Sequence, residues 1–378
     1  MKDRDFSLQE SIKSDLKTKI VLLTGPRQVG KTTLSKNLIS PYEYINYDIP
    51  EDRILVHERS WKKSTNLVIF DEIHKMKNWK SFLKGIYDDS TKKVPILVTG
   101  SARLEVSKKM GDSLAGRFFS YRLHPFDIKE LAGIEPPETV FQTLMKVGGF
   151  PEPYSSGSEK FYRRWKRSHL DIILRQDLID LENVRDIIKI ETLIELLKTR
   201  VGSPVSYSSL ARDLEKDPGT IKRWLDLLES LYVIFKVTPY HKNIARAILK
   251  EPKYYFYDIA LVENEGARLE NLVACALLKE LHRIEDLEGY DTVLHYLRTK
   301  DGKELDFLVV VNKKPKCILE VKLSDDSPSS SFMHFTAYFP GVPRIQLVGV
   351  LPREKEFDFG LKIVRAGSWL SQFSFSIL

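Results

Sequence analysis

Residues 25–32 read GPRQVGKT, and this stretch decides the fold of the first third of the chain. It satisfies the pattern G-x-x-x-x-G-K-[ST], it follows a continuous apolar run at 20–23, and helical spacing begins after it at Leu34 and Leu38. In the context of strand, loop and helix this pattern is typical of a phosphate-binding loop, with a chance match as the alternative. The glycines let backbone amides fold around a phosphate, Lys31 would reach the β and γ phosphates, and the Thr32 hydroxyl would ligate Mg²⁺. The residues predicted to bind ATP or ADP are Gly25, Pro26, Arg27, Gln28, Val29, Gly30, Lys31, Thr32 and Thr33.

Later in the chain come more short apolar runs, and polar residues follow two of them. The patterns predict strands at 44–47, 67–70 and 95–98 and a helix at 79–88. Strands that alternate with helices indicate a parallel α/β sheet, whose binding crevice lies at the carboxyl ends of the strands. Asp71 and Glu72 follow the run at 67–70, so we expect Asp71 to hold Mg²⁺ through water and Glu72 to polarise the attacking water. This pair predicts ATP hydrolysis rather than binding alone, although an ordinary acidic turn is the alternative.

Two further residues are candidates for contact with the γ phosphate. Ser101 follows the strand at 95–98 and is placed to sense the phosphate or the water, with Thr99 and Arg103 as neighbouring alternatives. Arg117 is the candidate arginine finger, because a guanidinium that reaches a neighbouring subunit would stabilise transition-state charge. That role implies a homo-oligomer, and a surface arginine beside the Gly116 turn is the alternative.

Composition limits the class of protein. The chain has 378 residues, which predicts about two to three domains. With 42% hydrophobic and 29% charged residues it is neither disordered nor a coiled coil, and a net charge of +7 permits a polyanionic partner. Cys275 and Cys317 alone exclude a disulfide framework, which favours a reduced, cytoplasmic protein. The charged first residues and the lack of a long apolar run predict neither a signal peptide nor a membrane partner.

The rest of the chain divides into three predicted parts. After a P-loop core at 1–135 we expect a helical connector at 136–189, with helices at 139–147 and 161–181. Residues 190–250 show helices at 192–200, 208–215 and 220–231 followed by an apolar strand, which is the winged helix-turn-helix pattern. Residues 251–378 return to an α/β pattern. Basic residues of the winged helix predict DNA binding. Acidic residues lie between them, so domain packing or protein binding is the alternative. The basic residues are Arg212, Lys216, Lys222, Arg223, Lys236, Lys242, Arg246 and Lys250.

The ordered set of motifs resembles a family of prokaryotic, often archaeal, AAA-type ATPases with a C-terminal domain of unknown function. The resemblance rests on GPRQVGKT, on FDEIHK with Trp79 and residues 83–88, on TGSAR, on LAGR with residues 123–130, and on GGFPEP, and it covers nearly the whole chain. It implies an AAA-like ATP-binding core, a winged-helix middle and a restriction-endonuclease-like end.

The nuclease-like end carries the pattern D-x(13)-E-x-K at Asp306, Glu320 and Lys322, across two adjacent expected strands. Period-two geometry puts Glu320 and Lys322 on one face, and strand pairing can bring Asp306 beside them. The two carboxylates would hold Mg²⁺ and the lysine would orient water against a phosphodiester. The resemblance adds Glu270, expected to start the preceding helix, as a further metal ligand. The alternative is a charged sheet face closed by local ion pairs, in which Glu304 pairs with Lys322.

The leading hypothesis is an ATP- and Mg²⁺-dependent ATPase that acts on or in response to DNA, with a nuclease-like domain whose activity stays open. The rival is a slow nucleotide switch that binds proteins and cuts nothing, and a transposition or defence factor would differ only in its partner. The histidines, including His57, His74 and His124, have no metal-ligand spacing with cysteine, so we interpret them as structural or surface groups.

Overall fold

The computed structural model describes residues 6–62, 64–89, 94–100, 114–177, 186–241, 251–357 and 360–375. The chain divides into two compact units. The first contains residues 1–124 with 230–232, and the second contains residues 125–229 with 233–378. Among the described residues, no helix combines the length and the apolar character that crossing a membrane requires.

The first unit is built on a five-stranded sheet in which every neighbouring pair is parallel. The strand order is β2-β3-β4-β1-β5. The strands are β1 (Ile20–Thr24), β2 (Tyr42–Asn46), β3 (Leu67–Asp71), β4 (Ile96–Thr99) and β5 (Phe118–Arg122). Because β4 lies between β1 and β3, the strand that precedes the glycine-rich loop and the strand that ends in Asp71 are separated by one strand only. The expected parallel α/β architecture is confirmed for this unit.

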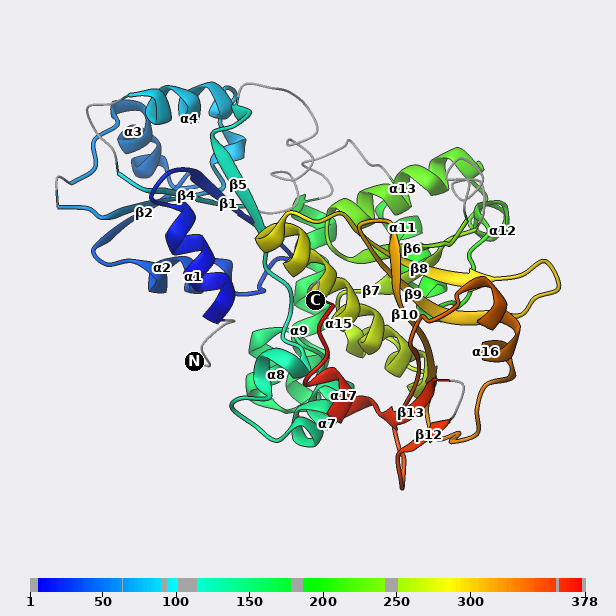
Figure 1. Ribbon diagram of the computed structural model, residues 1–378. Coiled ribbons are helices and arrows are strands. Elements are labelled where there is room, and N and C mark those ends of the chain that lie inside the picture. Colours follow the sequence, from blue (N-terminus) through cyan, green and yellow to red (C-terminus); the bar gives the residue numbers. More distant parts are fainter. Residues whose placement is uncertain are drawn as a thin grey trace. The chain divides into compact units, whose positions relative to one another are not determined.

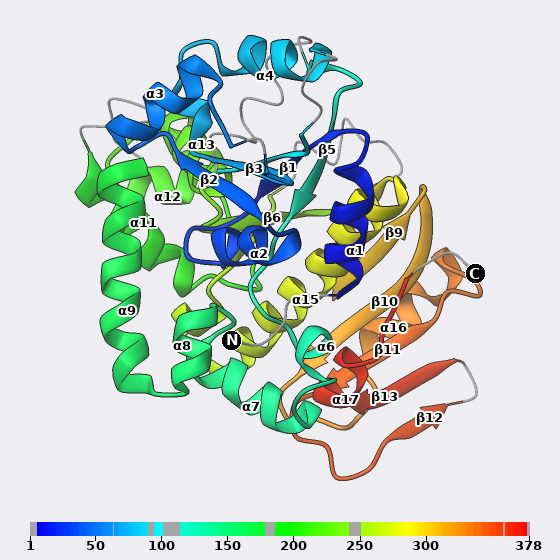
Figure 2. The same ribbon diagram turned by 90° about the vertical axis from the view of Figure 1, so that its left-hand side faces the viewer.

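Helices cover both faces of this sheet. In both ribbon views α3 (Pro50–Glu58) and α4 (Trp79–Asp88) lie on one face, and α1 (Phe6–Asp15) and α2 (Lys31–Leu38) lie on the other (Figures 1 and 2). Alternate strand residues such as Val68 and Phe70 pack with Leu83 and Ile86 of α4 in one buried core. The period of two in the strands and of 3.6 in the helix places these apolar side chains on facing surfaces.

The second unit begins with a helical region. It contains α6 (Ile128–Leu131), α7 (Pro137–Val147), α8 (Pro151–Ser156), α9 (Glu159–Ile172), a π-helical continuation (Ile173–Asp177), α11 (Ile187–Lys198), α12 (Tyr207–Asp213) and α13 (Pro218–Ser230). The expected helices at 139–147, 192–200, 208–215 and 220–231 correspond to α7, α11, α12 and α13, with ends that differ by a few residues.

An eight-stranded mixed sheet forms the rest of this unit, in the order β12-β13-β11-β10-β9-β8-β6-β7. Its strands are β6 (Ile234–Pro239), β7 (Lys253–Phe256), β8 (Thr292–Arg298), β9 (Glu304–Val311), β10 (Lys314–Lys322), β11 (Arg344–Val348), β12 (Lys355–Phe357) and β13 (Leu361–Arg365). Figure 2 shows β9, β10, β11 and β13 side by side. Strand β6, which we assigned to the winged helix, pairs both with β7 and with β8, so it belongs to the same sheet as the nuclease-like strands. The four-part domain division stays a prediction.

The long helix α15 (Glu265–Glu288) packs against β7, β8, β9 and β10. It begins five residues before Glu270, where we expected the helix to start, because the Asn264 side chain accepts a hydrogen bond from Ala267 N and caps the first turn. The helix ends at Gly289, whose φ of 73° is the left-handed conformation that glycine adopts most easily. Glu270 therefore lies inside α15 and not at its first turn.

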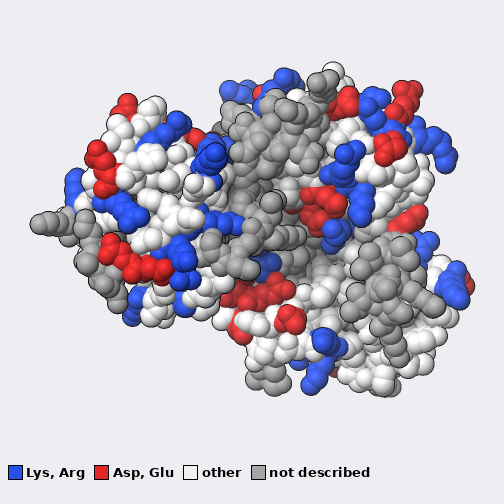
Figure 3. Space-filling view, turned by 90° about the horizontal axis from the view of Figure 1, so that it is seen from above, with Lys and Arg blue, Asp and Glu red and all other residues white. Residues whose placement is uncertain are grey.

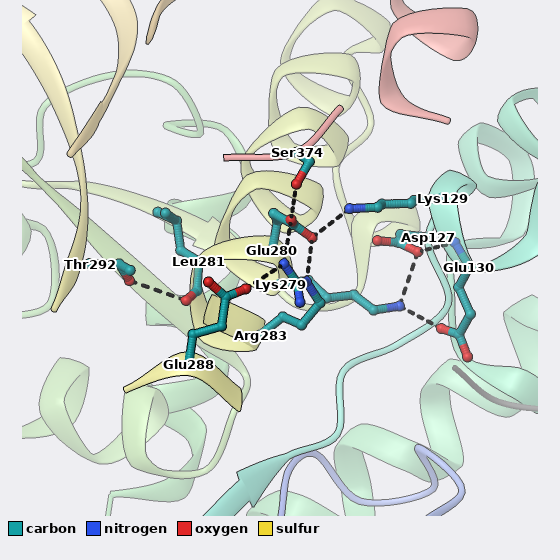
Figure 4. Close-up of polar contacts among 10 residues, drawn as sticks. All are labelled: Asp127, Lys129, Glu130, Lys279, Glu280, Leu281, Arg283, Glu288, Thr292 and Ser374. Carbon is teal, nitrogen blue, oxygen red and sulfur yellow. Dashed lines mark hydrogen bonds and ion pairs between the residues drawn. The ribbon is translucent and has the colours of Figure 1, made fainter. Parts of the chain in front are cut away.

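Charged side chains join α15 to the segment that opens the second unit (Figure 4). The Lys279 ammonium lies 3.0 Å from Asp127 Oδ1 and also bonds Glu130, while Lys129 lies 2.8 Å from Glu280 Oε2. Glu280 and Glu130 are almost fully buried, and a buried carboxylate needs a paired cation. These ion pairs anchor α6 to α15 within the second unit.

Candidate functional site

The backbone of the glycine-rich loop has the conformation that a phosphate cradle requires. Gly25 has a φ of 143° and Gly30 a φ of 99°, both in the region that favours glycine, and Gln28 has a φ of 57°. A Cβ on Gly25 would lie 2.2 Å from the Leu123 carbonyl oxygen, so only glycine fits at this position. Helix α2 starts at Lys31, directly after Gly30, and its first amides face the loop. The strand, loop and helix predicted around residues 25–32 are confirmed.

Three side chains predicted to act on the nucleotide meet at the carboxyl ends of β1, β3 and β4. The Thr32 hydroxyl lies 3.5 Å from Asp71 Oδ2, and Thr99 Oγ1 donates to Asp71 Oδ1 at 2.8 Å. The Lys31 ammonium donates to the carbonyl oxygens of Gly25 at 2.9 Å and Pro26 at 2.6 Å, which holds it over the loop. A hydroxyl and a carboxylate are the oxygen ligands that Mg²⁺ prefers, so Thr32 and Asp71 fit a magnesium ion.

Tyr44 is a site residue that sequence reasoning missed. Its hydroxyl donates a hydrogen bond to Asp71 Oδ2, the same oxygen that lies near Thr32. The parallel pairing of β2 with β3 explains the contact, because Asn46 is the partner of Asp71 and Tyr44 lies two residues before it on the same face. Burial and the Asp71 contact raise the pKa of Tyr44 well above its usual range, so the hydroxyl remains a donor. No local pattern signals this role.

Glu72 has the environment of a general base. Its backbone lies in the left-handed region at a φ of 55°, which is uncommon outside glycine and occurs often at functional sites. Burial first, and then the neighbouring Asp71 charge, raise the pKa of Glu72 to about 7. A base works best when its pKa lies near the working pH. The buried His74 Nε2 lies 3.2 Å from Glu72 Oε2, so His74, which we interpreted as structural or surface, contacts the site.

The predicted γ-phosphate contacts divide into three cases. Ser101 and its alternative Arg103 lie outside the described residues, while Thr99 contacts Asp71 as given above. Arg117 precedes β5 at the amino end of the strand, whereas the phosphate loop follows the carboxyl end of the parallel β1. Its guanidinium holds Asp88 through two hydrogen bonds of 2.9 and 3.2 Å. The role of Arg117 in a neighbouring subunit stays a prediction.

The nuclease-like residues gather on β9, β10 and α15. The register pairs Phe307 with Leu319, which puts Asp306 opposite Glu320 on one face. Lys322 Nζ lies 2.6 Å from Glu320 Oε1, and Asp306 Oδ2 accepts a hydrogen bond from Val321 N at 2.8 Å. Glu304 does not pair with Lys322, as the alternative supposed; it contacts Arg298 across the β8–β9 pair and also Lys253.

Lys253, which the sequence analysis did not single out, lies at the centre of these carboxylates. Its side chain is 0% exposed, and its ammonium contacts Glu304, Glu270 and Asp306. Within the described ranges, no three His, Cys, Asp or Glu side chains are grouped so as to hold a metal ion. The metal-binding role of Glu270, Asp306 and Glu320 stays a prediction. The buried Lys253 ammonium contacts Glu270 and Asp306, so it would compete with a metal ion for them. A lysine at the start of the apolar strand KYYF was the available signal.

The basic residues of the proposed winged helix are partly neutralised. Lys236 pairs with Glu229 at 2.8 Å and Lys216 with Asp186 at 2.7 Å. Lys222 and Arg223 are exposed on α13, whereas Lys242, Arg246 and Lys250 lie outside the described residues. On the face drawn in Figure 3, basic and acidic side chains are interspersed rather than segregated. The charges on this face therefore do not by themselves select nucleic acid as the partner.

Family models match three consecutive parts of the chain. Residues 17–132 match an AAA domain, which contains the loop, Asp71 and Glu72 described above. Residues 138–268 and 265–368 match two domains of unknown function, DUF8612 and DUF4143. Together these matches support an AAA-type ATPase family with C-terminal domains of unknown function, and they support a nucleotide-binding ATPase.

The chain is similar to uncharacterized proteins of other prokaryotes at low identity. An uncharacterized protein of Mycobacterium tuberculosis is 26% identical over 78% of this chain and 68% of its own length. One from Methanocaldococcus jannaschii is 26% identical over 78% of this chain and 73% of its own length. One from Haemophilus influenzae is 23% identical over 98% of this chain and 99% of its own length.

Solved structures give only distant similarity. A signal transduction ATPase with numerous domains and a tetratricopeptide repeat sensor, from Pyrococcus horikoshii, is 13% identical with a TM-score of 0.24. The match covers 74% of this chain and 47% of that one, so the present chain spans about half its length. The Hef helicase domain of Pyrococcus furiosus is 10% identical with a TM-score of 0.20, over 90% of this chain and 88% of that one.

Proposed function

We propose that the protein is an ATP- and Mg²⁺-dependent ATPase of the AAA type that acts on DNA. The observation that carries the ATPase part is the contact of Thr32 with Asp71 below a loop in which Gly25 and Gly30 have positive φ. The same AAA-type assignment is supported by the domain match over residues 17–132.

Each loop residue has a defined part in this proposal. The amides of residues 25–32 bind the phosphates, Lys31 neutralises the β and γ charges, and Thr32 and Asp71 hold Mg²⁺. Bound Mg²⁺ supplies stabilisation of charge on the phosphates. Glu72, whose pKa of about 7 lets it hold a proton near neutral pH, orients and deprotonates the attacking water.

ATP turnover by the purified chain tests this proposal. Lys31→Ala removes the phosphate-binding ammonium, and Glu72→Gln removes the base while keeping the shape of the side chain. We expect both variants to lose turnover by about 10²-fold or more, since a positioned base alone contributes about that factor. Glu72→Gln should still bind ATP in a calorimetric titration, whereas Lys31→Ala should bind it weakly. Lys77→Ala, an exposed lysine of the same unit, is the matched control.

We propose DNA as the partner through the winged helix predicted at residues 190–250, which contains α11 from residue 190 on, α12, α13 and β6. The exposed Lys222 and Arg223 of α13 would contact phosphates. Neutralising both should reduce DNA affinity measured by fluorescence anisotropy and lower its dependence on salt. Replacing the exposed Lys160 and Arg164 of α9 removes the same charge and should leave DNA affinity unchanged. ATP turnover that no nucleic acid stimulates would count against the DNA part.

The rival function, a nucleotide switch that binds a protein partner, is favoured by one observation. Lys216 and Lys236 pair with acids within the chain, and so offer less charge to a phosphate backbone. Affinity for DNA that does not change between the double variant and wild type would favour this rival.

The remaining proposals concern architecture. We propose that residues 251–378 adopt a restriction-endonuclease-like fold, which is supported by Asp306 and Glu320 lying on paired strands with Lys322 beside them. We also propose a cytoplasmic homo-oligomer in which Arg117 acts on the neighbouring subunit. Cys275 and Cys317 carry free thiols, which suits a reducing compartment.

A further inference from the structure

Lys253 is a charged residue in a position that otherwise suits an apolar one. It begins β7, whose other residues Tyr254, Tyr255 and Phe256 are all buried, and its own side chain is 0% exposed. A lysine is almost never fully buried unless it is paired. Its position therefore requires carboxylates, and α15 and β9 supply them.

The ammonium of Lys253 lies among three carboxylates. Its Nζ is 2.7 Å from Glu304 Oε1, 3.5 Å from Glu270 Oε1 and 3.6 Å from Asp306 Oδ1. Two of the three, Glu270 and Asp306, are residues that a restriction-endonuclease-like fold would use for Mg²⁺. A buried ammonium is drawn to the same negative potential as a metal ion, so the two cations compete for one place.

Other contacts of the cluster use the oxygens that a metal would need. Glu270 Oε1 also accepts a hydrogen bond from the Tyr255 hydroxyl at 2.7 Å, and Asp306 Oδ2 accepts one from Val321 N. Glu320 Oε1 lies 2.6 Å from the Lys322 ammonium. These protein donors, together with the Lys253 ammonium, already use oxygens that a metal ion would need, which agrees with the lack of a metal-type group among the described residues.

The charges of the cluster nearly balance without a metal ion. Four carboxylates, of Glu270, Glu304, Asp306 and Glu320, face the cations of Lys253, Lys322 and Arg298. The Lys253 ammonium, with three carboxylates within 3.6 Å, is the cation at the centre of this arrangement.

We propose that Lys253 is the resident cation of this carboxylate cluster: its ammonium takes the place of a divalent ion, and the cluster does not bind Mg²⁺. The inference rests on the proposed restriction-endonuclease-like fold of residues 251–378. A domain of this fold that lacks the metal has no Lewis acid to activate water against a phosphodiester. The C-terminal domain therefore does not cut nucleic acid by a metal-dependent mechanism.

A metal titration of the full chain tests the proposal. The probe is Mn²⁺ alone, without nucleotide, because carboxylate sites that take Mg²⁺ also take Mn²⁺ and its binding is measured directly by electron paramagnetic resonance. Wild type is compared with Lys253→Met, which keeps the length of the side chain and removes the charge. Lys314→Met, an exposed lysine on β10, is the matched control.

We expect wild type and Lys314→Met to show no Mn²⁺ site that Asp306→Asn removes and that is tighter than about 1 mM, the weak end of carboxylate cation sites. Lys253→Met should gain one site, and adding Asp306→Asn to the same chain should remove it. Because a ligand that binds only the folded state stabilises it, Mn²⁺ should raise the melting temperature of Lys253→Met and not that of wild type. Lys253→Gln repeats the test in case the methionine variant folds poorly.

Two results overturn the proposal. One is a Mn²⁺ site in wild type that Asp306→Asn abolishes, because the lysine would then not exclude the metal. The other is failure of Mn²⁺ to bind or to stabilise either Lys253 variant, because the ammonium would then not occupy a cation position. Neither result depends on ATP binding, because no nucleotide is present in the titration. The proposed ATPase function is tested separately, by the ATP binding and turnover of Lys31→Ala.

Discussion

Thr99 Oγ1 donates a hydrogen bond to Asp71 Oδ1 at 2.8 Å, and this contact joins the carboxyl ends of the neighbouring strands β4 and β3. It orients the carboxylate proposed to hold Mg²⁺. We expect Thr99→Val, which keeps the shape and removes the donor, to raise the Mg²⁺ concentration for half-maximal ATP turnover by about 10- to 100-fold, the usual effect of losing a residue that orients a metal ligand. Thr18→Val, which changes an exposed threonine of the same unit, is the control. An unchanged Mg²⁺ dependence would contradict the assigned role.

Tyr44 orients the other oxygen of Asp71. Tyr44→Phe removes only the hydroxyl. It should raise the Mg²⁺ concentration for half-maximal ATP turnover by about 10-fold and leave folding intact. Tyr42→Phe changes an exposed tyrosine of the same strand, so it should have no effect. If both variants behave alike, the Tyr44 contact does not position Asp71.

Gly25 should tolerate no side chain. Gly25→Ala places a Cβ 2.2 Å from the Leu123 carbonyl oxygen and also forces a φ of 143° on alanine. The backbone must shift, so ATP binding should be lost, and the free energy of unfolding should fall by at least about 1–3 kcal/mol, the cost of one strained residue. Urea denaturation measures this change. Gly133→Ala meets no atom within 4 Å and should stay within about 0.5 kcal/mol of wild type.

The Lys279 ion pairs should stabilise the second unit. Lys279→Met leaves Asp127 and Glu130 buried without their cation, and breaking a buried pair in this way costs about 3–5 kcal/mol. Lys362→Met breaks an exposed pair with Glu356 and should cost about 0–1 kcal/mol. Urea unfolding at neutral pH compares the two. Equal effects would show that the Lys279 cluster adds no more than a surface contact.

Asp258 should make stability fall as pH rises through weakly acidic values. Burial raises the pKa of this carboxyl to about 6, above its unfolded value near 4, so the folded state favours the protonated form. The stabilisation is complete below about pH 4 and is lost by about pH 7, a change of about 3 kcal/mol from this one group. Asp258→Asn cannot titrate, so the difference in unfolding free energy between wild type and variant should follow this curve. A flat difference from pH 4 to 7 would contradict the raised pKa.

Much of the ATPase site was predictable because its signals are local. Glycines at 25 and 30, the lysine and threonine after them and the acidic pair at 71 and 72 each follow an apolar run. The structure places them at the carboxyl ends of β1 and β3, which are separated by β4 alone. The α/β pattern of residues 251–378 was likewise found from its apolar runs, and the structure has strands and helices there. The start of α15 was misplaced because its signal, the cap residue Asn264, was not used.

Contacts between residues far apart in the chain were not predictable in the same way. Tyr44 reaches Asp71 only because β2 pairs with β3, and Lys253 meets Glu304 only because β7 enters the eight-stranded sheet. A single sequence records the period of each strand but not which strands pair. The choice of partner for each buried charge therefore depends on the fold.

Short-range pattern was enough to predict a glycine-rich loop between a strand and a helix and an acidic pair at a strand end, since backbone conformation and strand ends depend on a few neighbouring residues. Long-range packing was needed to show that Asp71 is held by Tyr44 and Thr99 and that a lysine lies among the carboxylates of the C-terminal unit. The physical reason is that a buried charge takes its partner from whichever elements the sheet brings beside it, at any distance along the chain.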